Sequence, residues 1–432
     1  MFFQKKSYIC ALIESKIIFI MRIKNLELKN IGPFKEANLD FIGENTIEKP
    51  PVTIITGENG TGKTIILDAI RALMFGPCDT LKRDILQDKN NFILNGHFAV
   101  ATQNEFLDLY IIAKGKANND AGFLTNQMQF NEKFNPYLGK NKGNDYWVTN
   151  YWTSKTSDEK FSISNLTTLE PEKYLENALT GVQPNVEVLK LICSFDYLRS
   201  SESPKEKEEG DFLFNIIKKI IKLSLIDGEF RYVERKTLMP IVYQTGSEVS
   251  LDKLSSGNLY LIQRLISLLG QMYSVYVLNN LSLSELCNTS GLLLIDEAEN
   301  HLHPKWQKTF INSILDIFPN LQIIITTHSP FIISSVENAR IYVCESKQDY
   351  SVVTDATAEY SNKPIEEILL SPVFDTNTFN TTITKLMEER KKAIEIHDFT
   401  KVDDLEKQLK AINPEYFSYF DVEQLLASLE NH

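Results

Sequence analysis

The stretch GLLLIDEAENHLHP runs from Gly291 to Pro304 and joins a short apolar segment to an abrupt acidic end. Residues 292–295 are four consecutive aliphatic side chains, a pattern that predicts a strand covered on both faces, as in a parallel sheet. Asp296 and Glu297 follow directly. Because ligands of open α/β sheets bind at the carboxyl ends of the strands, we expect these two carboxylates to lie at a binding site. The alternative is a strand that ends in a solvated acidic turn.

A second stretch, GENGTGKT, occupies Gly57 to Thr64 and follows the short apolar strand pattern of residues 52–55. It fits the pattern G-x-x-x-x-G-K-[ST] residue for residue, and a helix pattern follows at 64–75. The glycines let backbone N–H groups turn toward nucleotide phosphates at the positive end of that helix. The residues expected to bind the nucleotide are Gly57, Glu58, Asn59, Gly60, Thr61, Gly62, Lys63 and Thr64.

The presence of a phosphate loop in the same chain suggests a function for the two carboxylates at the end of the acidic strand. We expect Lys63 to reach the β- and γ-phosphates and the Thr64 hydroxyl to ligate Mg²⁺. Asp296 can then hold the same Mg²⁺ through water, and Glu297 can accept a proton from the attacking water. Beside a phosphate loop, this interpretation is favoured over a solvated turn.

Two further segments have the spacing of nucleotide-site components. In KLSSGNLYLIQRLISLL, Ser255, Ser256 and Gly257 precede an amphipathic helix and form a second candidate anion site, although an ordinary serine cap explains the same residues. One chain needs only one phosphate loop, so a second anion site implies a second subunit. In LQIIITTHSP, His328 follows another buried strand pattern at 321–325, where it can contact the γ-phosphate and the attacking water.

These four segments, in this order, resemble an ABC-type ATPase head with Walker A, signature, Walker B and switch histidine. The N-terminal IKNLELKNIGPFKEANLDF and the string IDEAENHLHPKWQ are closest to the SMC-like and OLD-like ATPases. The resemblance implies an α/β head of two lobes with a parallel or mixed sheet core. It also implies ATP and Mg²⁺ as cofactors, Glu297 and His328 as catalytic residues, and two heads that sandwich two ATP molecules. Each site would then take its signature residues from the partner chain.

Some elements of that family pattern have no secure counterpart. Gln87 and Gln103 are candidates for the glutamine of the Q-loop, and the signature ends in Asn258. His301 and His303 suggest a metal pair, but in the OLD-like pattern they belong to a loop with a structural or dimer-facing role.

The composition of the 432 residues indicates which partners and which compartment to expect. A net charge of −12 excludes a bulk polycationic clamp for nucleic acid, and five dispersed cysteines without a CxxC motif indicate reduced thiols in the cytoplasm.

We expect an extension or misassigned start at 1–20, an ATPase head at 21–345 and a polar insertion at about 114–190. The run SSESPKEKEEGD, 200–211, is expected to be an exposed linker, and 355–432 a helical partner-docking region. No apolar run long enough to span a membrane is evident, so no membrane partner is expected.

Two features that the sequence lacks, a long coiled coil and a Toprim acidic set, limit which ATPases of this kind it can resemble. Leu254 lies 190 positions after Thr64, a separation too short for the long coiled coil of SMC proteins, and no spaced Toprim acidic set follows His328. The helical tail contains EEILLSPVFDTN at 366–377 and KLMEERKKAIEIHDFTKVDDLEKQLKAINPEYF at 385–417. This tail most resembles the ATPases of Septu antiphage systems, including retron-associated forms. The alternatives are a PARIS-type or other OLD-like defence ATPase, and a RecF-like DNA repair ATPase. A transporter head is disfavoured.

The Septu resemblance implies a set of partners. These are further copies of the chain in a homo-oligomer, a separate HNH nuclease (PtuB-like), and DNA or retron RNA/DNA. Because the chain has a complete ATP site but no effector domain, we expect a switch in which ATP keeps the nuclease silent or positioned and hydrolysis or depletion releases it.

Overall fold

The computed structural model describes residues 21–43, 49–75, 88, 91–100, 106–113, 123–126, 147–153, 161–175, 185–225, 227–371, 374 and 380–420. The predicted extension at 1–20 and the candidates Gln87 and Gln103 lie outside these residues. The chain divides into two compact units, residues 1–368 and 369–432. The first unit is the head, and it extends beyond the boundary at 345 that the sequence suggested.

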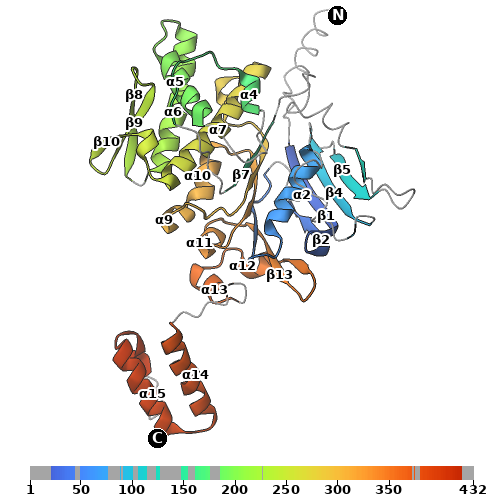
Figure 1. Ribbon diagram of the computed structural model, residues 1–432, viewed down its shortest axis with the longest axis vertical. Coiled ribbons are helices and arrows are strands. Elements are labelled where there is room, and N and C mark those ends of the chain that lie inside the picture. The colour runs from blue at the N-terminus through green and yellow to red at the C-terminus, as the bar shows by residue number, and fades with distance from the viewer. Residues whose placement is uncertain are drawn as a thin grey trace, which may run out of the picture. The chain divides into compact units, whose positions relative to one another are not determined.

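A mixed sheet of eleven strands, among the described residues, forms the centre of the head, in the order β6-β5-β4-β1-β2-β14-β13-β3-β12-β11-β7 (Figure 1). The strands are β1 (Met21–Ile31), β2 (Phe34–Asp40), β3 (Thr53–Gly57), β4 (Ile93–Val100), β5 (Phe106–Ala113), β6 (Phe123–Thr125), β7 (Val148–Trp152), β11 (Gly291–Ile295), β12 (Leu321–Thr326), β13 (Arg340–Ser346) and β14 (Ser351–Asp355). The strands from β13 to β7 run parallel, whereas β1, β2, β4, β5 and β6 pair antiparallel. The predicted α/β class with a mixed sheet core is confirmed.

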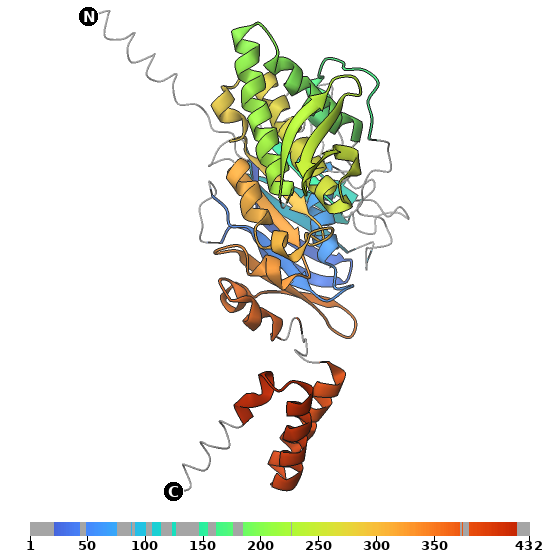
Figure 2. The ribbon, with the colours of Figure 1, turned by 90° about the vertical axis from the view of Figure 1, so that its left-hand side faces the viewer.

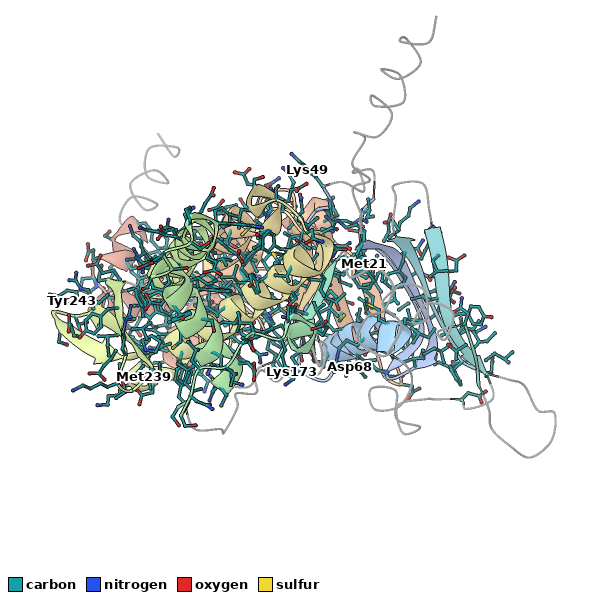
Figure 3. All side chains as sticks on the ribbon, turned by 90° about the horizontal axis from the view of Figure 1, so that it is seen from above. Met21, Lys49, Asp68, Lys173, Met239 and Tyr243 are labelled. Carbon is teal, nitrogen blue, oxygen red and sulfur yellow. The ribbon has the colours of Figure 1, made fainter. Side chains whose placement is uncertain are left out.

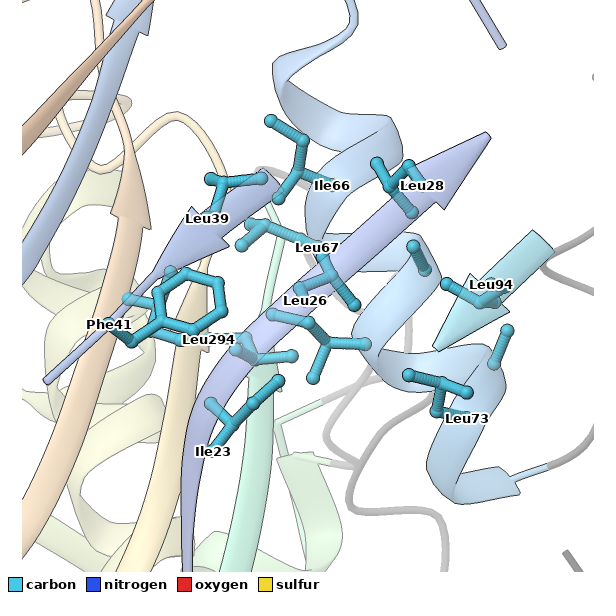
Figure 4. Close-up of a cluster of buried hydrophobic side chains, with 14 of the residues drawn as sticks. Ile23, Leu26, Leu28, Leu39, Phe41, Ile66, Leu67, Leu73, Leu94 and Leu294 are labelled. Carbon is cyan, nitrogen blue, oxygen red and sulfur yellow. The ribbon is translucent and has the colours of Figure 1, made fainter. Parts of the chain in front are cut away.

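Helix α2 (Lys63–Phe75) covers one face of this sheet. Figure 4 shows Ile66, Leu67 and Leu73 of α2 against Leu26 and Leu28 of β1, all fully or almost fully buried. Burying each such side chain stabilises the fold by about 1.5–3 kcal/mol, as an upper estimate. This packing fixes the start of α2, and therefore the phosphate loop, against the sheet.

A second group of elements packs beside β7. It consists of α4 (Pro171–Leu175), α5 (Asn185–Arg199), α6 (Pro204–Ser224), β8 (Gly228–Glu234), β9 (Met239–Gln244), β10 (Ser247–Ser250), the 3-10 turn η2 (Leu251–Lys253) and α7 (Ser256–Asn279). In Figure 3, Met239 and Tyr243 mark the three-stranded sheet of this group, well apart from Asp68 on α2. The group forms the second part of the expected two-lobe head.

Helix α7 is long and apolar enough to cross a membrane by composition, with a mean hydropathy of 1.2. Inside the protein, 78% of that apolar window is buried, against α4, α5, α6 and β7. Its apolar character is therefore accounted for by its place in the core of the head.

Two expectations about segments change. β7 lies within the range 114–190 assigned to an insertion, yet it pairs with β11 and so forms part of the central sheet. The prediction that residues 200–211 form an exposed linker is wrong from Pro204 onward, because α6 begins there. Proline in the first turn is compatible with a helix start, and the Glu206 carboxylate is favourable near the positive end of the helix. The charged residues of this run can therefore be exposed to solvent and helical at the same time.

The remaining elements follow the acidic strand. They are α8 (Leu283–Leu286), α9 (Pro304–Gln307), α10 (Phe310–Ile317), α11 (Pro330–Ile333), α12 (Thr357–Tyr360), α13 (Ile365–Leu369), α14 (Thr381–Glu395), α15 (Phe399–Ile412) and the 3-10 turn η3 (Tyr416–Ser418). α14 and α15 form an antiparallel hairpin in the second unit (Figure 2), with Leu405 and Leu409 in its small core. The helical character expected for the region 355–432 is confirmed at α14 and α15.

Candidate nucleotide site

The register of the parallel strands brings the predicted segments to one edge of the sheet. Ile295 of β11 pairs with Ile325 of β12 and with Trp152 of β7, and Ile55 of β3 pairs with Thr326. The loops that follow β3, β11 and β12 therefore begin at the same level. The phosphate loop, the acidic residues and His328 follow these three strand ends.

The phosphate loop requires glycine at two positions for steric reasons. Gly57 has φ +135°, and a Cβ there would lie 2.0 Å from the carbonyl oxygen of Cys344 on β13. Gly62 has φ +98°, and its Cβ would lie 2.6 Å from Pro33 and 2.7 Å from Phe34. Any side chain would displace the loop from the sheet, so the glycines set both its curvature and its depth.

The Lys63 side chain is buried and folded back over the loop. Its Nζ donates to the carbonyl oxygens of Gly57, at 3.0 Å, and Glu58, at 2.7 Å. Burial lowers the pKa of Lys63, while the nearby Cys344 and Glu299 act in the opposite direction. Its ammonium is thus partly desolvated, a condition that strengthens attraction to a phosphate.

Thr64 and Asp296 meet at the point where the Mg²⁺ ligands were expected. The Thr64 hydroxyl lies 3.0 Å and 3.1 Å from the two carboxylate oxygens of Asp296, 232 positions away in the chain. Asp296 also accepts from the Thr326 hydroxyl at 2.6 Å and from the Tyr151 hydroxyl at 3.5 Å. These hydroxyl contacts orient the carboxylate without neutralising it.

The oxygen ligands present fit Mg²⁺. Three carboxylates, Asp296, Glu297 and Glu299, stand within four positions, and no Lys or Arg within the described residues lies at salt-bridge distance from them. The described residues contain no cluster of three His, Cys, Asp or Glu ligands. Mg²⁺ commonly uses one or two protein oxygens and completes its shell with phosphate and water, and Thr64 and Asp296 could supply such a pair.

Glu297 occupies a strained backbone position. Its φ is +51°, in the left-handed region, and its backbone N–H donates to the Thr326 hydroxyl at 2.8 Å. The side chain is exposed and accepts from the amide of Asn300. A non-glycine residue held there costs about 1–2 kcal/mol, which the surrounding contacts offset.

His328 is half-buried just beyond the end of β12. Its backbone N–H donates to Glu299 Oε1 at 2.7 Å. Burial and the Lys63 charge lower the pKa of His328 from its ordinary value of 6.5, so the imidazole is mainly neutral at pH 7. A neutral ring can accept as well as donate a hydrogen bond near the site.

The signature segment has a structural role in its own chain. Ser255 caps α7 by accepting from the N–H of Asn258 at 3.4 Å, and a Cβ on Gly257 would lie 2.1 Å from the carbonyl oxygen of His301. Within the part of the chain that the structure describes, no hydrogen bond joins Ser255, Ser256 or Gly257 to the phosphate loop. The serines are exposed, while Gly257 is buried.

The two histidines of the HLHP segment make structural contacts. The His301 ring lies 5.4 Å from the Tyr260 ring on α7, and His303 caps α9 by accepting from the N–H of Lys305 at 3.2 Å. They belong to no metal cluster among the described residues.

Sequence reasoning missed the contribution of β7. Besides Tyr151 at Asp296, the carbonyl oxygen of Thr153 accepts from Tyr260 and Arg264 of α7, each at 3.0 Å. The end of β7 thus connects α7 to the carboxylate of Asp296. The run VTNYW, rich in aromatic and β-branched residues, is the pattern that could have predicted β7, but the residues on either side of it are polar and favour a loop. Thr326, Glu299 and Asn300 were also missed.

Comparisons with known proteins agree with this geometry. A family model described as "AAA domain, putative AbiEii toxin, Type IV TA system" matches residues 125–334, and a second, "AAA domain", matches 21–119. Both models describe AAA domains, so the head is similar to ATPases that carry such a domain.

Individual relatives narrow the class. The Retron Vc95 probable ATPase of Vibrio cholerae serotype O1 biovar El Tor is 25% identical over 389 residues, covering 75% of this chain and 73% of the relative. The Septu protein PtuA of Bacillus thuringiensis is 25% identical over 324 residues, covering 72% and 73%. The chain is thus a homologue of the retron and Septu ATPases. Among solved structures, the SMC head domain from Thermotoga maritima matches with a TM-score of 0.44 and 13% identity, covering 77% and 98%.

Proposed function

We propose that this chain binds ATP with Mg²⁺ and hydrolyses it as the ATPase subunit of a bacterial antiphage defence system of the Septu and retron type. The observation that carries the proposal is the meeting of Thr64 with Asp296 at 3.0 Å, because it joins a phosphate loop to an acidic strand end. The names of the relatives in Vibrio cholerae and Bacillus thuringiensis, each matched over about three quarters of its length, support the defence role.

The residues would divide the chemistry as follows. Backbone N–H groups of residues 57–64 would hold the phosphates, and Lys63 would leave its carbonyl partners to reach them. A bound Mg²⁺ would supply charge neutralisation of the phosphates, beside Thr64 and Asp296. Glu297 would accept a proton from the attacking water, and the neutral His328 would orient that water or the γ-phosphate.

Phosphate release by the purified chain tests the ATPase proposal. We expect Mg²⁺-dependent hydrolysis that EDTA abolishes and that Lys63→Ala abolishes through loss of nucleotide binding. Lys363→Ala is the matched control, since that lysine is exposed and pairs with Glu367 at 2.7 Å on the surface. Equal hydrolysis by wild type and Lys63→Ala would show that another site or a contaminant is responsible.

We propose further that two heads share their ATP sites. The exposure of Ser255 and Ser256 supports a role across a dimer. The test is complementation between a Lys63→Ala chain and a Ser255→Glu chain, each inactive alone. Mixing them should restore activity, because one composite site keeps an intact Lys63 and an intact signature. Ser255 is preferred to Gly257, whose substitution would also displace His301. Absence of recovery would assign each site to a single chain.

The partner proposed for the helical hairpin is a separate HNH nuclease, within a cytoplasmic complex that can also hold DNA or retron RNA/DNA. Exposed apolar side chains at Ile396, Phe399 and Tyr416 support a docking role for the hairpin.

Cys193, Cys287 and Cys344 are free thiols, which supports the cytoplasm, a reducing compartment, as the location of the proposed complex. Affinity purification from the native operon with mass spectrometry tests this. An HNH protein is expected, a Toprim partner would favour the PARIS type, and a homodimer alone would favour DNA maintenance.

A further inference from the structure

The carboxylate of Glu299 has no task in the proposed chemistry, yet both of its oxygens are engaged. Oε2 accepts from the Thr327 hydroxyl at 2.6 Å, and Oε1 accepts from the backbone N–H of His328 at 2.7 Å. Both donors belong to the loop after β12, whereas Glu299 belongs to the loop after β11. One side chain thus joins the loop of Glu297 to the loop of His328.

The connection continues through a buried polar chain. The Thr327 hydroxyl, which donates to Glu299, accepts from the Ser329 N–H at 2.9 Å. The Ser329 hydroxyl donates to Gln307, and the Gln307 amide donates to the carbonyl oxygen of Leu302 at 2.9 Å. The chain therefore returns to the loop from which Glu299 projects. Thr327, Ser329 and Gln307 are all at least 92% buried.

Such a closed network fixes geometry more strongly than separate surface contacts. Its hydrogen bonds lie largely away from water, and losing one partner leaves a buried group unsatisfied. Backbone contacts add to it, since Ala298 N–H donates to the carbonyl oxygen of Thr326 at 2.9 Å. The relative positions of Glu297 and His328 are thereby set by contacts between the two loops.

We propose that Glu299 is a positioning residue for ATP hydrolysis, which holds His328 in register with Glu297 by binding Thr327 and the His328 backbone. The inference rests on the proposed ATPase function of this site. Among the described residues Glu299 makes no hydrogen bond to the phosphate loop, and it acts on Lys63 through its charge alone, so we expect its main effect on the hydrolytic step and a smaller one on nucleotide binding.

The test is a double-mutant cycle on the full-length chain. Glu299→Ala should lower kcat about 10- to 100-fold, the loss expected from misplacing a group near the reacting atoms, with KM and ATP affinity changed less than about threefold. In the His328→Ala background, Glu299→Ala should change kcat by less than about twofold, because the residue it positions is already absent. A full effect in that background would overturn the inference.

Two milder variants keep the test decisive if Glu299→Ala does not fold. Thr327→Val removes one donor to Glu299 with little change of shape, and Glu299→Gln keeps one acceptor oxygen. Each should lower kcat less than Glu299→Ala and show the same dependence on His328. The matched control is Glu337→Ala, at an exposed position in the same lobe.

The possible outcomes separate the two proposals. If wild type hydrolyses ATP in a Glu297-dependent way but the Glu299 and Thr327 variants match it, only the positioning role fails. If wild type binds ATP without hydrolysing it, or does neither, the proposed function fails and the inference fails with it.

Discussion

The end of β11 and the α14–α15 hairpin hold their carboxylates in opposite ways. Asp296, Glu297 and Glu299 are held by hydroxyl, amide and backbone N–H donors, so their charge is oriented but not cancelled. In the hairpin, Glu406 is 4% exposed and is met by the Arg390 guanidinium through Nε at 2.9 Å and Nη2 at 2.6 Å. Uncancelled charge is expected where a cation or a proton must be received, and a matched pair where only structure is needed.

Glu297→Gln should give the largest change. It keeps the shape and the contact with Asn300 but removes the proton acceptor, so kcat should fall about a thousandfold while ATP affinity stays near wild type. Single-turnover hydrolysis with purified protein measures this, with Glu337→Gln as control. Activity close to wild type would show that the carboxylate is not the base.

Arg390→Met should be the next largest and should act on stability alone. Removing the arginine leaves the buried Glu406 without its guanidinium and should cost the hairpin about 3 kcal/mol. Amide hydrogen exchange of residues 380–420 should therefore speed up, while ATP hydrolysis is unchanged. The double variant Arg390→Met with Glu406→Met should recover most of the protection. Loss of ATPase activity in Arg390→Met would contradict the division between the two regions.

Arg264→Met should have a moderate effect, because it removes one of the two hydrogen bonds to the Thr153 carbonyl oxygen. A lost bond of this kind is worth about 1 kcal/mol, so kcat should fall about fivefold through displacement of Tyr151 and Asp296. Steady-state kinetics measure it, and Arg231→Met, in the exposed three-stranded sheet, is the control. A change in ATP affinity without a change in kcat would contradict the connection through β7.

Acidification should produce a smaller, His328-dependent loss of stability. The folded-state pKa of His328 lies below its ordinary value of 6.5, so between the two values the unfolded chain binds more protons. Stability from this group is complete above pH 6.5 and declines as the pH falls toward the folded-state pKa. Thermal unfolding at a series of pH values should show a shallower decline in His328→Gln. Parallel curves for the two proteins would assign the decline to other groups.

Lys363→Met should change least. Lys363 and Glu367 are 44% and 56% exposed, and a pair this open to water contributes less than about 0.5 kcal/mol. Its melting temperature should match wild type, in contrast to the loss of hairpin protection in Arg390→Met. A clear destabilisation would mean that exposure does not separate the two kinds of ion pair here.

Much of the fold and the site could be predicted because their residues are contiguous in the chain. A phosphate loop needs eight consecutive positions with glycine where a Cβ would collide, and the acidic strand end needs an apolar run followed by carboxylates. Residues 57–64, Asp296, Glu297 and His328 could therefore be named as candidates, and the structure brings them to one edge of the sheet. The helices of the hairpin were also predictable, from apolar side chains at helical spacing.

The phosphate loop, the acidic strand end and the α/β class could be predicted from the chain alone, because local steric and periodic requirements specify them. Three contacts became evident only in the folded protein: β7 pairs with β11, Tyr151 contacts Asp296 across 145 positions, and Glu299 joins the loops after β11 and β12. Those contacts depend on strand order and register, which arise from packing between distant segments and leave no local pattern in the chain.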